Sequence, residues 1–125
     1  MEILREESVD PAHVIIGHAD TYLDHAYHRA VLQQGAYLQF DTIAREHMNP
    51  DSRRADALVQ LLREGWGERL LLSSDRCHRP DLKAFGGVGY DVVFTRFFER
   101  LRALGVSEDD LKLMSEENPR RILAW

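Results

Sequence analysis

Three short apolar runs, each followed by a polar residue and a longer amphipathic stretch, constrain the fold of this chain most strongly. The runs are Val14–Ile16, Ala36–Phe40 and Arg69–Ser74. Strands that alternate with helices pair in parallel, because each crossover helix returns the chain to the same end of the sheet. The sequence therefore predicts an α/β fold with three parallel strands. The β-branched run Val14–Ile16 is typical of a strand that is buried on both faces.

The stretches between the runs have the apolar spacing of helices. We predict helices over residues 21–34, 49–64 and 90–104, because glycines at 35, 65 and 105 stand where helices commonly end. Residues 1–8 are expected to be the tail of a further helix. Ser107 and Asp110 resemble a capping box for a short helix, and Asn118 with Pro119 begins a last turn.

Composition restricts the function classes. The chain has 125 residues, 44% of them apolar, which fits one domain over residues 1–125 with a packed core. A net charge of −5 with scattered basic residues gives no reason to bind nucleic acid or an anionic membrane. The one cysteine, Cys77, is expected to be an ordinary loop residue. Without a signal sequence or a long apolar run, the expected location is the cytoplasm.

Each apolar run ends near a residue that can bind a metal or transfer a proton, namely His18, Asp41 and Asp75. The carboxyl ends of parallel strands lie on one edge of the sheet, so these side chains are expected to converge there. Histidine and carboxylate are suitable ligands for zinc or a similar divalent ion. Each residue also has an ordinary alternative: a hydrogen-bonded histidine for His18, and loop-anchoring aspartates for the other two.

Two further groups of residues have structural interpretations. His25 and His28 could share one helix face, and a solvated helix surface is the expected reading of that pair. The aromatic stripe in the helix at residues 90–104 is expected to belong to the core, and it comprises Phe94, Phe97 and Phe98.

Five segments together resemble the phosphotriesterase family of the amidohydrolase superfamily, and especially its phosphotriesterase homology proteins. Three of them resemble the family's sixth, seventh and eighth barrel strands, and the other two resemble the end of its long last loop and its closing Asn-Pro motif. The segments are, in that order, Val14–Asp20, Gln39–Ile43, Leu70–Asp75, Gly86–Asp91 and Glu117–Leu123. The resemblance covers essentially the whole chain. It implies the last three strand–helix units of a (β/α)8 TIM barrel, which alone form an incomplete barrel.

The resemblance also implies roles for the three strand-end residues. The family site holds two divalent metals, usually zinc. His18 matches the ligand of the more exposed metal. Asp75 matches the ligand of the more buried metal, which also accepts a proton during catalysis. Asp41 matches an aspartate near the site.

The loop after Asp75 corresponds to the family's substrate-facing loop, in which we expect Arg76, His78 and Arg79 to lie near the substrate. One residue departs from the phosphotriesterase pattern. Those enzymes carry a proton-relay histidine after the strand-seven aspartate, where this chain has Thr42. That difference puts the relay and efficient organophosphate hydrolysis in doubt.

The expected function is that of the C-terminal part of a binuclear zinc-dependent hydrolase acting on a small-molecule ester, either a phosphotriester or a lactone. The family's other metal ligands belong to strands one, four and five, so the isolated chain is expected to have little or no activity. The alternative is a non-catalytic fragment or half of a split barrel. Its counterpart would be a partner chain that supplies strands one to five, or a second copy in a homo-oligomer.

Overall fold

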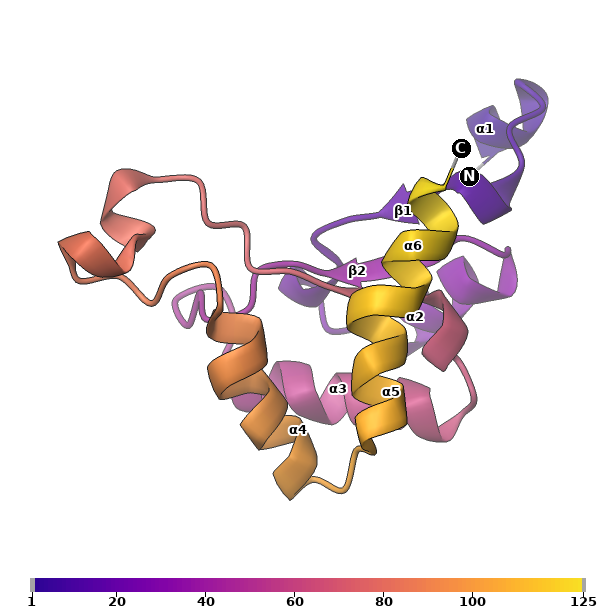
Figure 1. The fold of residues 1–125 in the computed structure, drawn as a ribbon. Coiled ribbons are helices and arrows are strands. Elements are labelled where there is room, and N and C mark those ends of the chain that lie inside the picture. Colours follow the sequence, from indigo (N-terminus) through magenta and orange to yellow (C-terminus); the bar gives the residue numbers. More distant parts are fainter. Residues whose placement is uncertain (1, 125) are drawn as a thin grey trace.

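The computed structural model describes residues 2–124 and contains a parallel sheet of three strands in the order β1-β2-β3 (Figure 1). The strands are β1 at Ile15–Ile16, β2 at Tyr37–Phe40 and β3 at Leu70–Leu72. In the register of the sheet Ile16 lies opposite Leu38, and Leu38 lies opposite Leu70. The predicted parallel α/β arrangement is confirmed, although every strand is shorter than its apolar run.

Six α-helices accompany the sheet within residues 2–124. They are α1 at Glu2–Glu6, α2 at His25–Gln33, α3 at Asp51–Arg63, α4 at Phe98–Ala103, α5 at Glu108–Lys112 and α6 at Asn118–Leu123. Turns of π-helix at Val93–Phe97 and Leu113–Glu117 lead into α4 and join α5 to α6. No helix in this part of the chain combines the length and apolar character that a membrane crossing requires.

Helix α2 begins four residues later than the sequence predicts. The predicted start at Thr21 is wrong because Ala19–Thr21 form a separate 3-10 turn. The Asp24 side chain then accepts a hydrogen bond of 2.7 Å from the Tyr27 amide, and this capping bond fixes the helix start. At the other end Gly35 has φ +89°, the left-handed conformation expected of a residue that follows a helix.

The hydrophobic core lies between one face of the sheet and the helices. Leu38, Phe40 and Leu70 are fully buried there, together with apolar residues of α3 and α4. Figure 1 shows α3 and α4 on one side of the sheet, while the loop between β3 and α4 extends away from the body. The other face is covered incompletely: Ile15 in β1 remains 37% exposed. The prediction that Val14–Ile16 is buried on both faces is therefore wrong, because β1 is an edge strand here.

Two expectations about side-chain burial are also wrong. His28 is not on a solvated surface: it is fully buried, its ring centroid lies 5.4 Å from that of Phe40, and its Nε2 lies 2.9 Å from the Ala19 carbonyl oxygen. Phe94 is 54% exposed rather than part of the core, because it lines an open pocket beside Ser74 and Asp75. The other two aromatic residues of the stripe, Phe97 and Phe98, are buried as expected.

A buried asparagine attaches the last helix to the sheet. The Asn118 side-chain amide donates hydrogen bonds of 2.8 Å to the carbonyl oxygens of Gly67 and Leu70, at the start of β3. Asn118 is fully buried, so these two bonds satisfy carbonyl groups that water cannot reach. The Asn-Pro pair thus joins α6 to the sheet as well as beginning the helix.

Candidate active site

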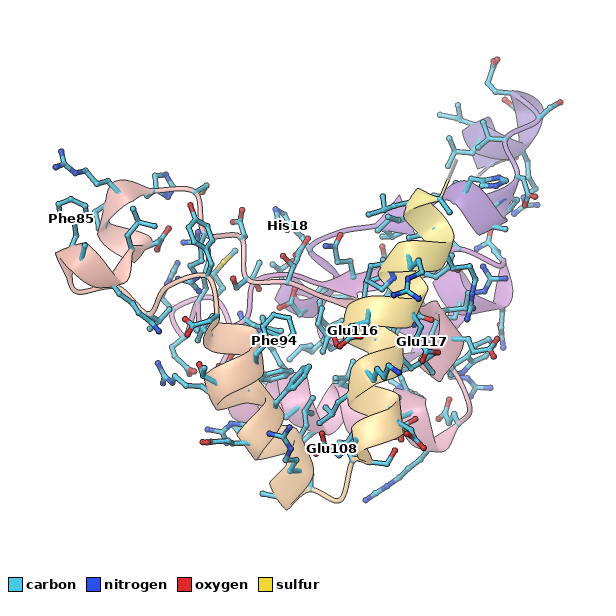
Figure 2. The ribbon with its side chains drawn as sticks, viewed as in Figure 1. His18, Phe85, Phe94, Glu108, Glu116 and Glu117 are labelled. Atoms are coloured by element: carbon cyan, nitrogen blue, oxygen red, sulfur yellow. The ribbon has the colours of Figure 1, made fainter. Side chains whose placement is uncertain are left out.

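The loop that follows β1 exposes a histidine in an unusual backbone conformation. His18 has φ +53°, in the left-handed region that costs a non-glycine residue about 1–2 kcal/mol. Its carbonyl oxygen accepts hydrogen bonds from the Thr21 amide at 3.0 Å and from the Thr21 hydroxyl at 2.7 Å. The side chain is 61% exposed. Figure 2 shows it standing clear of the ribbon, between the loop carrying Phe85 and the C-terminal helices in this view.

Asp41 holds His18 in place through both its backbone and its ring. The Asp41 Oδ1 atom accepts the His18 amide hydrogen bond at 2.9 Å and lies 2.7 Å from His18 Nδ1. A carboxylate can only accept, so Nδ1 carries a proton, and Nε2 of the neutral ring keeps its lone pair. The hydrogen bond and the charge of Asp41 raise the pKa of His18 above its ordinary value. The negative charge of Asp75 contributes to the same rise to a smaller extent.

Beneath this pair lies a buried polar network that joins the loops after β1 and β2. The Asp20 carboxylate accepts hydrogen bonds from the amides of Asp41 and Thr42 at 3.1 and 3.0 Å. It also accepts one from the Thr42 hydroxyl at 2.7 Å and one from Arg54 Nε at 2.8 Å. Asp20, Thr42 and Arg54 have no exposed area, so only the contact with the Asp41 amide involves a residue that is not fully buried. The carboxylate is therefore fully satisfied although it is buried.

Sequence reasoning missed this network, yet a signal for it was present. Arg54 stands four and seven residues before Leu58 and Leu61, both fully buried, and so belongs to the apolar face of α3. A charged residue on that face requires a buried partner. The sequence cannot show that the partner is Asp20, because the loop after β1 reaches α3 only in the folded chain.

Asp75 follows β3 and shares the left-handed conformation of His18, with φ +45°. Its side chain is 40% exposed, and its Oδ2 atom lies 3.4 Å from Nε of Arg45, a residue of the loop after β2. The Arg45 guanidinium also donates a hydrogen bond to the Asp75 carbonyl oxygen. Asp75 lines an open pocket of about 370 Å³ together with Ser74, Tyr90 and Phe94. The left-handed conformation at both strand ends is the kind of local strain that occurs at functional sites.

Two arginines and one aspartate hold the loop after Asp75. Arg76 donates a hydrogen bond of 2.6 Å to the Ile43 carbonyl oxygen and pairs with Asp81 at 3.2 Å. Its side chain is only 6% exposed. Arg45 adds a second cation 3.5 Å from Asp81. The structure therefore gives Arg76 a role in joining the loops after β2 and β3.

The other two residues expected to face a substrate have exposed side chains on the same loop. The His78 side chain is 72% exposed. The Arg79 guanidinium lies 4.3 Å from the centre of the Phe85 ring, a cation–π contact that keeps it on the outer part of the loop. The loop also requires a glycine at Gly87, where a Cβ atom would lie 2.2 Å from the Asp81 backbone.

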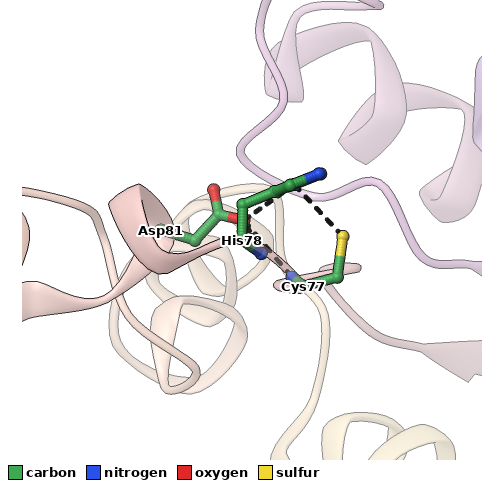
Figure 3. Close-up of side chains that lie close together, drawn as sticks. All are labelled: Cys77, His78 and Asp81. Carbon is green, nitrogen blue, oxygen red and sulfur yellow. Dashed lines mark hydrogen bonds and ion pairs between the residues drawn. The ribbon is translucent and has the colours of Figure 1, made fainter.

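The side chains of Cys77, His78 and Asp81 lie close together in the first half of this loop, as Figure 3 shows. The Cys77 Sγ atom lies 3.3 Å from His78 Nδ1, and Asp81 Oδ2 lies 3.7 Å from the same nitrogen. The Asp81 carboxylate already accepts the amides of Cys77 and His78 at 3.3 and 3.1 Å. Because Arg45 and Arg76 also pair with it, a metal cation here would meet two positive charges. The cluster is better explained as the cap that shapes the loop.

The donor set at the strand ends does suit a divalent cation. His18 offers an imidazole nitrogen whose other ring nitrogen is held by a carboxylate, the arrangement typical of metal-binding histidines. Asp75 offers a partly exposed carboxylate whose Oδ2 atom lies 3.4 Å from Arg45 Nε, so a cation here would meet one positive charge where the Asp81 carboxylate meets two. These are nitrogen and oxygen ligands of the kind that zinc accepts in catalytic sites. Two ligands are fewer than the three protein ligands that such sites usually contain.

Comparison with known proteins agrees with this fold. The model of the phosphotriesterase family matches residues 1–123. The chain therefore belongs to the phosphotriesterase family. The phosphotriesterase homology protein of Escherichia coli (strain K12) is 38% identical over 119 residues, which cover 95% of this chain and 41% of that protein. N-acetyltaurine hydrolase of Dictyostelium discoideum is 29% identical, with 98% of this chain and 36% of that protein covered.

Solved structures superpose closely on the chain. The crystal structure of the Escherichia coli phosphotriesterase homology protein, complexed with phosphate in its active site, gives a TM-score of 0.94 at 38% identity. The superposed region covers 96% of this chain and 41% of the Escherichia coli chain. A lactonase from Listeria monocytogenes gives a TM-score of 0.91 at 30% identity, with coverages of 98% and 39%. The chain thus spans about two fifths of the length of the relatives it matches.

Proposed function

We propose that this chain supplies His18 and Asp75 as ligands to the divalent-metal site of a hydrolase that cleaves a small-molecule ester. The observation that carries the proposal is the contact between His18 Nδ1 and Asp41, which keeps the Nε2 lone pair available at the exposed rim of the sheet. Asp75 follows β3, which is separated from β1 by β2 in the parallel sheet, and so it stands at the same edge of the sheet as His18. Two candidate ligands from separate strands therefore lie on one rim.

Zinc is the proposed metal, because a histidine nitrogen and a carboxylate oxygen are both suitable ligands for it. A divalent ion at this site would lower the pKa of a bound water to near 7 and so supply hydroxide at neutral pH. The chain's own contribution is to hold the His18 ring through Asp41 and to present the Asp75 carboxylate. In this proposal Asp75 also accepts a proton during the reaction.

The proposed placement of the three strands is that of strands six to eight in a (β/α)8 barrel. The high TM-scores to relatives of more than twice the length support it. The reaction class is supported by relatives described as a lactonase and as an aryldialkylphosphatase, the latter from Saccharolobus solfataricus and 23% identical. Both descriptions concern ester-type substrates, so a phosphotriester or a lactone is the proposed substrate class.

A chimeric enzyme tests this proposal. Residues 2–124 would replace the matching C-terminal part of the Escherichia coli phosphotriesterase homology protein, whose fold superposes at a TM-score of 0.94. We expect the chimera to hydrolyse a lactone or an aryl phosphotriester with added zinc, and His18→Ala or Asp75→Ala to abolish the activity. An exposed histidine, His13, provides the matched control His13→Ala. Activity that survives both site substitutions would contradict the proposal.

The 125-residue chain by itself is proposed to be inactive, because it contributes fewer ligands than a catalytic zinc site requires. The test is hydrolysis of an aryl ester or lactone by the pure chain with added zinc, against His18→Ala as the background. Turnover well above that background would overturn this part of the proposal.

One observation favours a second candidate function, as half of a split barrel. Within residues 2–124, β1 and β3 each pair with β2 only, so the outer edge of each of these two strands pairs with no further strand. Open edges of this kind favour association with another strand. If this candidate is right, the chain will co-purify at a fixed stoichiometry with a co-expressed segment carrying strands one to five of the same Escherichia coli relative. Separate elution of the two chains would exclude it for that partner, and elution of the chain alone as a dimer would indicate self-association.

A further inference from the structure

The two loops that carry His18 and Asp41 hold each other reciprocally. The loop after β2 provides the Asp41 carboxylate, which receives the amide and the ring nitrogen of His18. In return, the loop after β1 provides the Asp20 carboxylate, which receives the amides of Asp41 and Thr42. The position of the Asp41 backbone is therefore set by Asp20, which stands two residues after the histidine that Asp41 contacts.

Arg54 and Thr42 complete the anchor of Asp20. The Thr42 hydroxyl donates to Asp20 at 2.7 Å and accepts from Arg54 Nη2 at 2.9 Å, so its two roles are complementary. Arg54 also donates to the Arg45 carbonyl oxygen at 3.2 Å and to Asp51 at 3.0 Å. Because these acceptors hold the Arg54 guanidinium in one orientation, Arg54 restricts the rotation of the Asp20 carboxylate. Any other position of the carboxylate would leave buried donors unpaired.

We propose that Asp20 is a positioning residue for His18: with Thr42 and Arg54 it fixes the Asp41 backbone, so that Asp41 keeps the His18 proton on Nδ1 and leaves Nε2 as the acceptor. Thr42, which stands where phosphotriesterases carry a relay histidine, thereby has a function of its own in this chain. The proposal rests on the proposed function only in taking Nε2 as the atom that binds the metal.

The tautomer of His18 is the quantity to measure. In the full chain labelled with 15N-histidine, two-bond 1H–15N spectra separate a protonated ring nitrogen from an unprotonated one at a pH where the ring is neutral. The His18→Ala variant assigns the signals. We expect wild-type His18 to show an unprotonated Nε2. Asp20→Asn is expected to move the Nε2 signal toward the protonated position, because an amide cannot accept from all four donors.

Three further variants separate positioning from stability. Thr42→Val removes only the hydroxyl link, keeps the side-chain shape and is expected to shift the tautomer in the same direction. Thr42→Ser keeps the hydroxyl and is expected to retain the wild-type signal. Leu111→Ala perturbs a buried residue of α5, away from the network, and is expected to lower the melting temperature without moving the signal.

If Asp20→Asn does not fold, Thr42→Val and Thr42→Ser decide the question. The proposal is overturned if folded Thr42→Val keeps the wild-type tautomer, or if Leu111→Ala shifts it equally. The measurement needs no metal and no substrate, so its result stands whether or not the chimera hydrolyses an ester. An inactive chimera with the expected tautomer pattern would reject the proposed function alone.

Discussion

Asp20 and Arg54 form an ion pair of 2.8 Å in which neither side chain is exposed. Removing one partner of a buried pair leaves the other charge without compensation, which typically costs about 3–5 kcal/mol. We therefore expect Arg54→Met to lower the free energy of unfolding by that amount, measured by urea denaturation. The adjacent Arg53 is exposed, so Arg53→Met is a matched control with an expected change within about 0.5 kcal/mol. Equal effects of the two substitutions would contradict a structural role for the pair.

The link between Asn118 and the start of β3 gives a second prediction. Asn118→Asp replaces the donor amide by a carboxylate, so the carbonyl groups of Gly67 and Leu70 lose their partners. An unsatisfied buried group costs about 1–3 kcal/mol, and we expect a loss of at least that size on chemical denaturation. Gln60 is exposed on α3, and Gln60→Glu serves as a control with the same change of atoms. A variant as stable as the wild type would show that these bonds contribute nothing.

The loop after β3 is expected to depend on pH through Asp81. The hydrogen bond from the His78 amide holds the pKa of Asp81 below its ordinary value, and the charges of Arg45 and Arg76 lower it further. A carboxyl group with a lowered pKa in the folded state stabilises the fold above its unfolded pKa of about 4, and this effect is lost as the pH falls through the lower folded value.

Asp81→Asn tests this dependence. The difference in melting temperature between the wild type and the variant should be largest near neutral pH and should shrink once the pH drops below about 4. A difference that stays constant over this range would show that the charge of Asp81 does not stabilise the loop.

The fold was largely predictable because local pattern determines it. The alternation of apolar runs and amphipathic stretches predicted the parallel sheet, and Gly35 and Ser107 marked a helix end and a helix start that the structure confirms. The errors arose where a side-chain contact replaced the local pattern. Asp24 is the N-cap of α2, so the helix begins later than expected. His28 is buried in the core, where its Nε2 atom contacts the Ala19 carbonyl oxygen.

The candidate site was predictable only in part. His18, Asp41 and Asp75 could be identified because strand ends of a parallel sheet meet on one edge. The contacts that hold these three side chains could not be predicted, because the contacts join segments that are far apart in sequence. Asp20 contacts Thr42 and Arg54, and Arg45 contacts Asp75. The sequence likewise did not show that Arg76 would be engaged by Ile43 and Asp81.

Asp41 should influence metal binding indirectly. Residues that orient a metal-binding histidine through its other ring nitrogen typically contribute about 10–100-fold to affinity. In the chimera we expect Asp41→Asn to weaken zinc binding within that range, measured by competition with a chromophoric chelator. Asp24→Asn, at the start of α2, is the control and should leave the affinity unchanged. An affinity for zinc that does not change in Asp41→Asn would show that the contact with His18 has no bearing on metal binding.

The most direct test of the account is the metal content of the chimera after dialysis, determined by mass spectrometry. The account predicts bound divalent metal in the chimera and in His13→Ala, and a loss of metal in His18→Ala and in Asp75→Ala. Retention of the full metal content by both site variants would contradict the assignment of His18 and Asp75 as ligands, and with it the proposed hydrolase function.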